Sequence, residues 1–484
     1  MTVISFSRQL QLLADADPDR VAITCGADSI TRAQLVERGG DLAVYLRQHG
    51  VGDGDMVTIA LPNGIDWFVA YVATWRLGAI PQPISSHLPA REIAAIMELA
   101  DPSAVIGVAE GSVAGRLCLP HGFRAPRADA TGLPDLVSRA WKAPTSGGST
   151  GRPKLIVSGD PAELDPDEPA PHLLGSDDCL VMPGPLYHNG PAIWSWQALL
   201  HGNHVALLPR FDAEATLAAI QEHRARSLYV VPTMMKRISR LPDEVRFGYD
   251  VSSLKVVWHL AEPCPPWLKQ AWIDWLGAEH IYELYAGTEA QTATVITGPE
   301  WLTHRGSVGR PAFGAVCIMD AAGHELPPGE MGEVWLRNTR QTPTYHYVGA
   351  TARARVDGWE SLGDMGYVDY EGYLYLGDRA NDMILCGGAN IYPAEVEAAL
   401  QEHPAISSCA VIGLPDADMG NVVHAIIEAD AAAIDVTELR QFLAERLVSY
   451  KLPRTFELVS EPLRNDAGKV RRSALREARL DRPR

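Results

Sequence analysis

The chain has 484 residues, 46% hydrophobic and 21% charged, so it is long enough for at least two domains with buried cores and is not a disordered tail. Its 42 Lys and Arg residues against 60 Asp and Glu residues give a formal net charge of -18, which disfavours nucleic acid and anionic membranes as partners. No apolar stretch approaches the roughly 20 residues of a membrane helix. The seven cysteines lack metal-site spacing and suit reduced thiols, so we expect a cytoplasmic protein.

Short apolar strands alternate with helical patterns over much of the chain. A strand at 55–63 is followed by an apolar helix at 64–78 and a second strand at 79–85. The alternation returns further along, with helices expected between four strands at 204–209, 225–232, 254–263 and 280–287. This order predicts a layered α/β body with a mostly parallel sheet.

The pattern changes at 329–377, where short strands and Gly-Asp turns predict a small β-rich subdomain. From about Asn381 a unit of roughly 100 residues follows, which is large enough for a domain. It is expected to contain two helices and a strand, at 394–404, 436–448 and 408–415. The polar, Arg-rich segment 463–484 predicts an exposed tail. We therefore expect a domain boundary near Arg379.

The segment from Thr145 to Lys154 reads TSGGSTGRPK and combines three glycines, several hydroxyl side chains and a lysine. The glycines let the backbone turn tightly and present its N–H groups, and the lysine adds a positive charge, which suits a polyphosphate. The segment matches neither the P-loop pattern nor the Rossmann pattern. Taken alone it is more typical of a flexible surface loop, and that alternative stays open at this point.

Five further segments accompany this one along the chain, at Tyr285–Glu289, Gly363–Gly366, Asp378–Asp382, Gly387–Glu395 and Gly468–Lys469. In order and spacing the six segments resemble the motifs of the adenylate-forming superfamily of acyl-CoA synthetases, nonribosomal adenylation domains and luciferases. The resemblance covers nearly the whole chain. It has two departures: Ala286 replaces a usual glycine, and Asn381 stands where Asp or Lys is usual.

The resemblance implies an α/β fold with a large N-terminal adenylation domain at 1–378, made of layered α/β subdomains and a small β-rich subdomain. A hinge at 379–381, with Asn381 as its pivot, joins this domain to a smaller, mobile α+β lid domain at 382–484. The implied activity is that of an ATP- and Mg²⁺-dependent ligase. It converts a carboxylic acid into acyl-AMP with release of pyrophosphate, and then transfers the acyl group to a nucleophile while the lid domain rotates.

Attack of a carboxylate on the α-phosphate brings two anions together, so the site must supply positive charge. By the resemblance, Lys469 in the lid is the mobile catalytic lysine and Glu289 holds Mg²⁺. His188 gates the carboxylate or, alternatively, acts as a base toward the acceptor. The residues expected to bind the nucleotide are Ser146, Gly147, Gly148, Ser149, Thr150, Gly151, Lys154, Ala261, Glu262, Pro263, Tyr285, Ala286, Gly287, Thr288, Asp364 and Arg379.

The residues expected at the acyl and acceptor pocket are Tyr187, His188, Asn189, Trp194, Trp258, Gly387 and Gly388. An isolated His or Trp is more often a core residue, and core packing is expected for at least one of Trp194 and Trp196. The resemblance assigns no role to Glu262. Three arginines could meet the phosphates of CoA: Arg454, Arg471 and Arg472.

The acceptor of the acyl group is the open point of the resemblance. The motifs look most like those of CoA ligases for bulky acids, such as steroid, bile-acid or aromatic acyl groups. The ATP-dependent amide bond synthetases keep the same motifs and use an amine instead. Further alternatives are an adenylation domain that loads a carrier protein and a non-catalytic nucleotide or acyl sensor, which intact Lys469, Glu289 and Asp364 disfavour. The expected partners are a small carboxylic acid with CoA or an amine, and a homodimer is one option.

Overall fold

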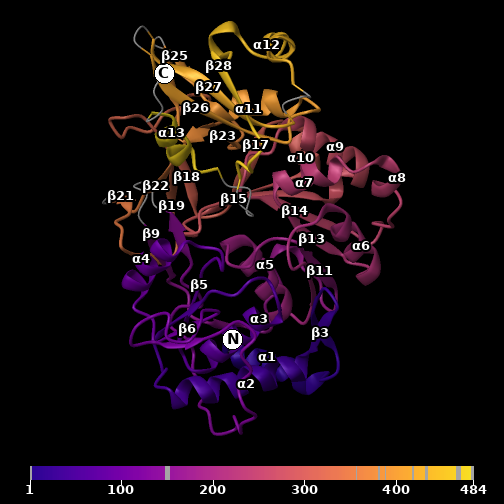
Figure 1. The fold of residues 1–484 in the computed structure, drawn as a ribbon, viewed down its shortest axis with the longest axis vertical. Helices are drawn as coiled ribbons and strands as arrows, with labels where there is room; N and C mark the ends of the chain where they lie inside the picture. The colour runs from indigo at the N-terminus through magenta and orange to yellow at the C-terminus, as the bar shows by residue number, and fades with distance from the viewer. Residues whose placement is uncertain are drawn as a thin grey trace.

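Figure 1 shows a computed structural model of the chain, with the N-terminal part at one end and the C-terminal part at the other. The structure describes residues 3–147, 153–355, 357–379, 382–386, 389–416, 419–430, 434–464 and 470–480. Over these residues, none of the helices is both long and apolar enough to span a bilayer. All seven cysteines are free thiols.

A small parallel sheet lies in the N-terminal part, with strands in the order β5-β4-β6-β7. Helix α3 joins β4 to β5 and is buried from Trp67 to Trp75, so its apolar character extends around the whole helix. It packs tightly on α2 (Arg32–Gln48), where a Cβ on Gly39 would lie 2.4 Å from Val72 Cγ1. The predictions for 55–85 are confirmed. The elements of this layer are β4 (Met56–Ile59), α3 (Ile65–Arg76), β5 (Ile80–Pro83), α4 (Ala90–Ala100), β6 (Ala104–Ile106) and β7 (Leu117–Leu119).

A 14-stranded sheet forms the centre of the molecule. Its parallel part runs in the order β15-β14-β13-β11-β12-β2, as the alternation of strands and helices predicts. Its strands are β2 (Val21–Cys25), β11 (Cys179–Met182), β12 (His204–Leu207), β13 (Ser227–Val230), β14 (Val256–Leu260) and β15 (Ile281–Ala286), with β3 (Asp28–Thr31) at the edge. The helices beside it are α1 (Phe6–Ala16), α5 (Asn189–Leu200), α6 (Ala213–His223), α7 (Pro232–Ser239), α8 (Asp243–Arg246) and α9 (Pro266–Leu276).

The antiparallel strands of the β-rich part continue the same sheet beyond β15. The β-rich region therefore begins at Ala293, earlier than the predicted 329, because β16 and β17 pair directly with the parallel strands. Its elements are β16 (Ala293–Thr297), α10 (Gly298–Thr303), β17 (Ser307–Phe313), β18 (Ala315–Met319), β19 (Gly332–Arg337), β21 (Arg353–Ala354), β22 (Glu360–Val368) and β23 (Leu374–Arg379). A three-stranded sheet joins β8 (Thr145–Gly147), β9 (Pro153–Ser158) and β20 (Tyr345–Val348), and β1 (Ile4–Ser5) pairs with β10 (Glu163–Leu164).

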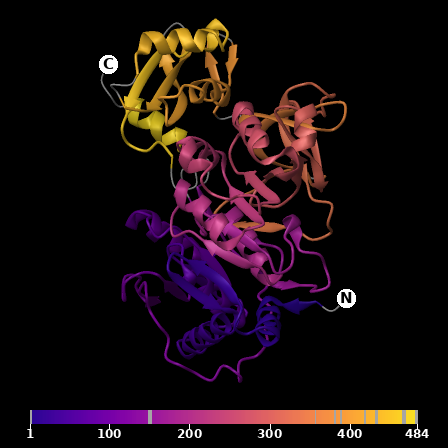
Figure 2. The ribbon, with the colours of Figure 1, turned by 90° about the vertical axis from the view of Figure 1, so that its right-hand side faces the viewer.

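The C-terminal unit has its own sheet and its own apolar core, which includes Ile391, Val411 and Leu439. Figure 2 shows this unit, in orange and yellow, standing apart from the indigo N-terminal layer with the magenta sheet between them. It touches the N-terminal part where Lys236 Nζ donates to the Ile406 carbonyl at 3.3 Å. Its elements are β24 (Ile384–Cys386), β25 (Ala389–Ile391), α11 (Pro393–Gln401), β26 (Ser408–Asp416), β27 (Gly420–Glu428), α12 (Val436–Ala444), β28 (Thr455–Val459) and α13 (Arg472–Leu480).

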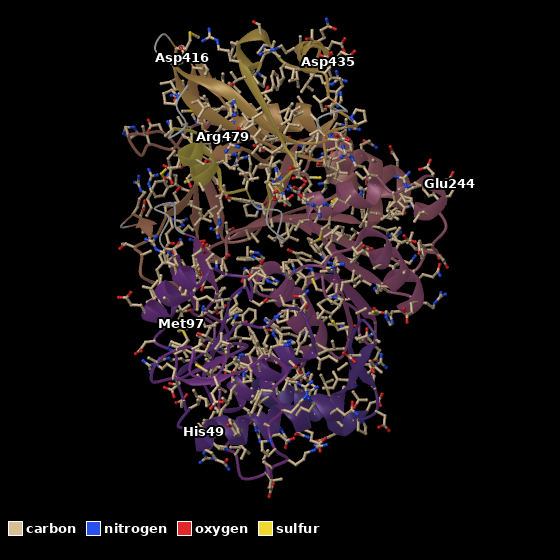
Figure 3. All side chains as sticks on the ribbon, in the orientation of Figure 1. His49, Met97, Glu244, Asp416, Asp435 and Arg479 are labelled. Carbon is tan, nitrogen blue, oxygen red and sulfur yellow. The ribbon has the colours of Figure 1, made fainter. Side chains whose placement is uncertain are left out.

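Part of the segment predicted as an exposed tail is helical. Residues Arg472–Leu480 form α13, which carries no buried residue and is held by ion pairs. Arg472 Nη2 lies 2.8 Å from Glu397 Oε2, and Arg479 Nε lies 2.5 Å from Glu457 Oε2. Figure 3 labels Arg479 on the C-terminal unit, far from His49 at the other end of the molecule. Within the described residues, ion pairs therefore give this unburied helix a fixed place.

Candidate active site

The strands on both sides of the Ser/Gly/Thr loop form an antiparallel pair. Ser146 on β8 lies opposite Lys154 on β9, so the strand register fixes where the lysine leaves the backbone. Gln82 Nε2 on β5 donates to Thr145 Oγ1 at 2.7 Å and fastens the pair to the N-terminal sheet. Ser146 Oγ is buried and has no hydrogen-bond partner within the described part of the chain, so it remains available to a ligand. The loop residues Gly148, Ser149, Thr150 and Gly151 lie outside the described residues.

Lys154 meets Glu289, although 135 positions separate them. Its Nζ lies 3.3 Å from Glu289 Oε1 and 3.8 Å from the centre of the Tyr347 ring. The Tyr347 hydroxyl donates to the same carboxylate oxygen, and Thr344 Oγ1 donates to the Glu289 carbonyl at 2.7 Å. Burial and this hydrogen bond raise the pKa of Tyr347, which keeps the hydroxyl a donor. Tyr347 was not predicted, because only the pairing of β20 with β9 brings it here.

The Glu289 carboxylate is suited to Mg²⁺. The ion takes one or two protein carboxylates together with phosphate oxygens and water. Across the described ranges no group of three or more His, Cys, Asp and Glu side chains could hold a metal ion. Glu289 is 6% exposed and has a cation beside it, so a second cation would have to displace Lys154 or share the carboxylate with it.

Tyr285, near the end of β15, contacts Asp364 in the middle of β22. The Tyr285 hydroxyl donates to Asp364 Oδ2 at 2.6 Å. Gly287, two residues further on, has no room for a side chain, since a Cβ there would lie 2.4 Å from Leu362 Cδ1. Ala286 is exposed, so its methyl group meets no comparable close contact. Thr288 lies in the same turn, directly before Glu289. In register, Asp364 stands opposite Arg379, whose side chain lies outside what the structure describes.

Glu262 makes contacts with Thr233 that its sequence motif did not predict. Its Oε2 accepts from Thr233 N at 3.0 Å and from Thr233 Oγ1 at 2.8 Å, at the first turn of α7. Its Oε1 is buried without a partner over the described ranges. Burial raises the pKa of this carboxyl group. Ala261, with φ of +72°, turns the chain from β14 toward this contact, and Pro263 follows it. Glu262 therefore fastens the β14 end to α7.

Three of the residues predicted for the acyl pocket, Tyr187, His188 and Asn189, lie at the start of α5. His188 is the N-cap residue of this helix, and its ring lies 4.3 Å from the ring of Tyr187. Asn189, the first helical residue, accepts a hydrogen bond at Oδ1 from Lys142 Nζ. A Cβ on Gly190 would lie 2.3 Å from the Tyr229 hydroxyl, so β13 passes close to this helix start. Neither Lys142 nor Tyr229 was predicted, because neither belongs to a recognisable motif.

Aromatic rings surround Trp194, which lies one turn further along α5. The His172 ring stacks on Trp194 with 3.9 Å between centroids, and the Tyr229 and Trp258 rings lie 5.4 and 5.9 Å away. Trp258 Nε1 donates to the His172 carbonyl at 2.8 Å and holds the 165–178 loop against the strands. Trp196 instead packs among the core rings of α3, 4.4 Å from Trp75, so the prediction that one of the two tryptophans is a core residue is confirmed.

Four predicted site residues lie outside the described part of the chain: Lys469, Asn381, Gly387 and Gly388. The three arginines suggested for CoA contact acidic groups in this structure, with Arg454 Nη1 3.1 Å from Asp416 Oδ2 and Arg471 Nη1 3.1 Å from Glu92 Oε1. Arg472 is paired with Glu397 in the C-terminal unit.

The sequence matches two family models. Residues 10–138 and 143–346 match the model described as AMP-binding enzyme, and residues 395–469 match the AMP-binding enzyme C-terminal domain. The chain is 32% identical over 483 residues to a feruloyl-CoA synthase of Amycolatopsis sp, and the alignment covers 96% of both chains.

Two solved structures have the same fold. An o-succinylbenzoate CoA synthetase of Bacillus subtilis, in complex with the acyl-adenylate intermediate OSB-AMP, matches with a TM-score of 0.82 and 23% identity over 100% of this chain and 99% of its own. The amide bond synthetase McbA of Marinactinospora thermotolerans matches with a TM-score of 0.80 and 25% identity over 98% and 99%. The fold prediction is confirmed, and the chain belongs to the AMP-binding enzymes of the adenylate-forming superfamily.

Proposed function

We propose that the chain is an ATP-dependent acid–CoA ligase that first forms an acyl-adenylate and pyrophosphate. The observation that carries the proposal is the cluster of Lys154, Glu289 and Tyr347 beside the phosphate loop, together with the Tyr285–Asp364 pair. These groups offer a cation and a metal-binding carboxylate to phosphates, and a ring and a carboxylate to a nucleoside.

In this proposal the residues of the site bind different parts of ATP. Lys154 and Ser146 bind phosphate oxygens, Asp364 accepts from the ribose hydroxyls, and Tyr285 lies against the adenine. Glu289 holds Mg²⁺, which neutralises phosphate charge when bound. Lys469 contributes the positive charge between the carboxylate and the α-phosphate. The o-succinylbenzoate CoA synthetase of Bacillus subtilis has also been solved with ATP and a magnesium ion.

For the acyl group we propose an aromatic acid. Trp194, Trp258, Tyr229 and His172 form a closely packed aromatic cluster behind the start of α5, in which the first three are buried. Aromatic pairs of this kind contribute beyond the area that they bury. The feruloyl-CoA synthase relative, at 32% identity, is consistent with such a substrate. Ferulate and related hydroxycinnamates are therefore the first acids to test.

The domain arrangement belongs to the same proposal. We assign 1–378 to adenylation, 379–381 to the hinge with Asn381 as its pivot, and 382–484 to a lid that rotates between the two half-reactions. Gly387 and Gly388 then approach the pantetheine arm of CoA. The cytoplasm is the proposed compartment, since it supplies both ATP and CoA, and a homodimer is the proposed assembly.

An amine is the second candidate acceptor. The likeness to the amide bond synthetase McbA, at 25% identity over 98% of this chain, supports an amine as the alternative acceptor. The first half-reaction would be the same, and acyl-AMP would be attacked by nitrogen instead of sulfur.

The test is an acceptor competition. Purified protein is incubated with ATP, Mg²⁺, a panel of hydroxycinnamic, benzoic, alicyclic and fatty acids, and equal concentrations of CoA and a primary amine. Pyrophosphate release and product masses are followed together. The proposal predicts an acyl-CoA as the main product; a dominant amide would make the chain an amide bond synthetase. The Lys469→Ala variant serves as the control, and wild-type rates of acyl-AMP formation in it would refute the role of this lysine.

A further inference from the structure

Lys142 is a buried lysine without an acidic partner. It is 7% exposed, and its Nζ donates to Asn189 Oδ1 and lies 4.3 Å from the centre of the Trp141 ring. Among the described side chains no carboxylate lies within ion-pair distance of it. Buried lysines are normally paired with a carboxylate, as Lys269 is with Glu283 at 2.6 Å in this same molecule. Lys142 therefore has capacity to bind a further acceptor.

The two carboxylates that act on Lys142 from a distance are already paired. Asp160 contacts Arg340 at 2.5 Å, and Glu289 contacts Lys154. Their negative charge favours protonated Lys142, but burial outweighs it and lowers the pKa of the amine to about 7. The amine itself contacts two uncharged groups, the Asn189 amide and the Trp141 ring.

The location of Lys142 points toward the reacting end of the acid. It stands three residues before Thr145, where the phosphate-loop strand begins, and its partner Asn189 opens α5 directly after His188. A helix start is the positive end of the helix dipole and disfavours a lysine unless an anion is present. Lys142 also falls between the two stretches that match the AMP-binding family model, 10–138 and 143–346.

We infer that Lys142 binds the carboxylate of the acid substrate at the start of α5 and holds it for attack on the α-phosphate. The inference rests on the proposed function and adds a substrate-binding residue to it. The anion is the missing partner of the buried amine: it accepts from Nζ and stabilises the protonated form.

The test compares Lys142→Met and Lys142→Gln with wild type, using the acid that wild type activates best in the panel. A charge-assisted hydrogen bond of this kind corresponds to about 10- to 100-fold in affinity. We expect the KM for the acid to rise by that factor in both variants while the KM for ATP stays unchanged. Gln keeps a donor for Asn189 and a polar side chain, so it isolates the charge and also serves if the Met variant does not fold.

Two further readouts separate binding from a structural role. The inhibition constant of the matching carboxamide should change little in the variants, because the carboxamide carries no charge. In wild type the KM for the acid should rise with pH above about 7, as the amine loses its proton, whereas Lys142→Arg should bind the acid with no such dependence. The matched control is Lys236→Met, which also removes a buried lysine, 4% exposed, but at the contact with Ile406.

An unchanged KM for the acid in the Gln variant would overturn the inference, as would an equal rise in the KM for ATP or the same loss in Lys236→Met. Absence of pyrophosphate release by wild type with every acid would instead refute the proposed function. The two failures are therefore distinguishable.

Discussion

Replacing Glu289 with Gln tests the metal role of this carboxylate. The substitution preserves the shape of the side chain and an oxygen that can accept from the Tyr347 hydroxyl, but it removes the negative charge. Hydrogen bonds to charged groups contribute about 1.5–3 kcal/mol, and we use this range for the contact of one carboxylate with Mg²⁺. We therefore expect the Mg²⁺ concentration that half-saturates adenylation to rise by about 10- to 100-fold.

The effect on folding has to be measured beside the assay. The substitution also removes the 3.3 Å ion pair with Lys154, and Glu289 is only 6% exposed. Breaking a buried ion pair lowers the free energy of unfolding by up to about 3–5 kcal/mol, so thermal melts of the Gln variant are recorded at each Mg²⁺ concentration. A loss of pyrophosphate release at a temperature where the melt shows folded protein then reflects the site and not unfolding.

The assay measures pyrophosphate release at fixed ATP while Mg²⁺ is varied from below the ATP concentration to a large excess. Tyr347→Phe is the matched control, because it removes a contact of Glu289 and leaves the carboxylate in place. Its Mg²⁺ midpoint should not rise. The reasoning would be refuted by an unchanged midpoint in Glu289→Gln, or by an equal rise in Tyr347→Phe.

Three other substitutions test separate parts of the structure. Burial raises the pKa of the Glu262 carboxyl group above its ordinary 4.5, so ionisation of this group lowers the stability of the protein as pH rises through the folded-state pKa. Glu262→Gln removes the ionisable group and should therefore raise Tm at pH 8. The gain in Tm should disappear near pH 4, which thermal melts at the two pH values measure. Glu397 is instead paired with Arg472 at 2.8 Å, so Glu397→Gln should lower the free energy of unfolding by about 3–5 kcal/mol, and an unchanged urea midpoint would contradict the assigned pairing. Tyr285→Phe removes the 2.6 Å hydrogen bond to Asp364 and should raise the KM for ATP by about 3- to 10-fold with little change in the KM for the acid; equal changes in both would argue against a nucleotide role.

The sequence predicted the layers of the fold because hydrophobic periodicity is a local property. The apolar run at 64–78 and the strands on both sides of it became α3, β4 and β5. The β-rich region was placed too late in the chain, since the pairing of β16 with β15 depends on the sheet edge that is available and not on local composition. The helix α13 was missed because its segment is polar and Arg-rich and none of its residues is buried; ion pairs hold it instead.

The same distinction applies to the site. Motifs identified Lys154, Glu289, Tyr285 and Asp364, because each stands in a short segment with a recognisable order of residue types. The sequence could not show which of them touch, nor that Tyr347 contacts both Lys154 and Glu289.

The partners of Glu262 and Lys142 were likewise set by tertiary structure. Thr233 reaches Glu262 from the neighbouring strand end, and Asn189 reaches Lys142 from a helix that starts 47 positions further along the chain. Residue type and spacing in the sequence thus determined the fold class and the chemistry that is available. Which charges are neutralised, and that the Lys142 amine has no carboxylate beside it among the described side chains, was decided only by packing, because burial and distance are set by segments that are far apart in the chain.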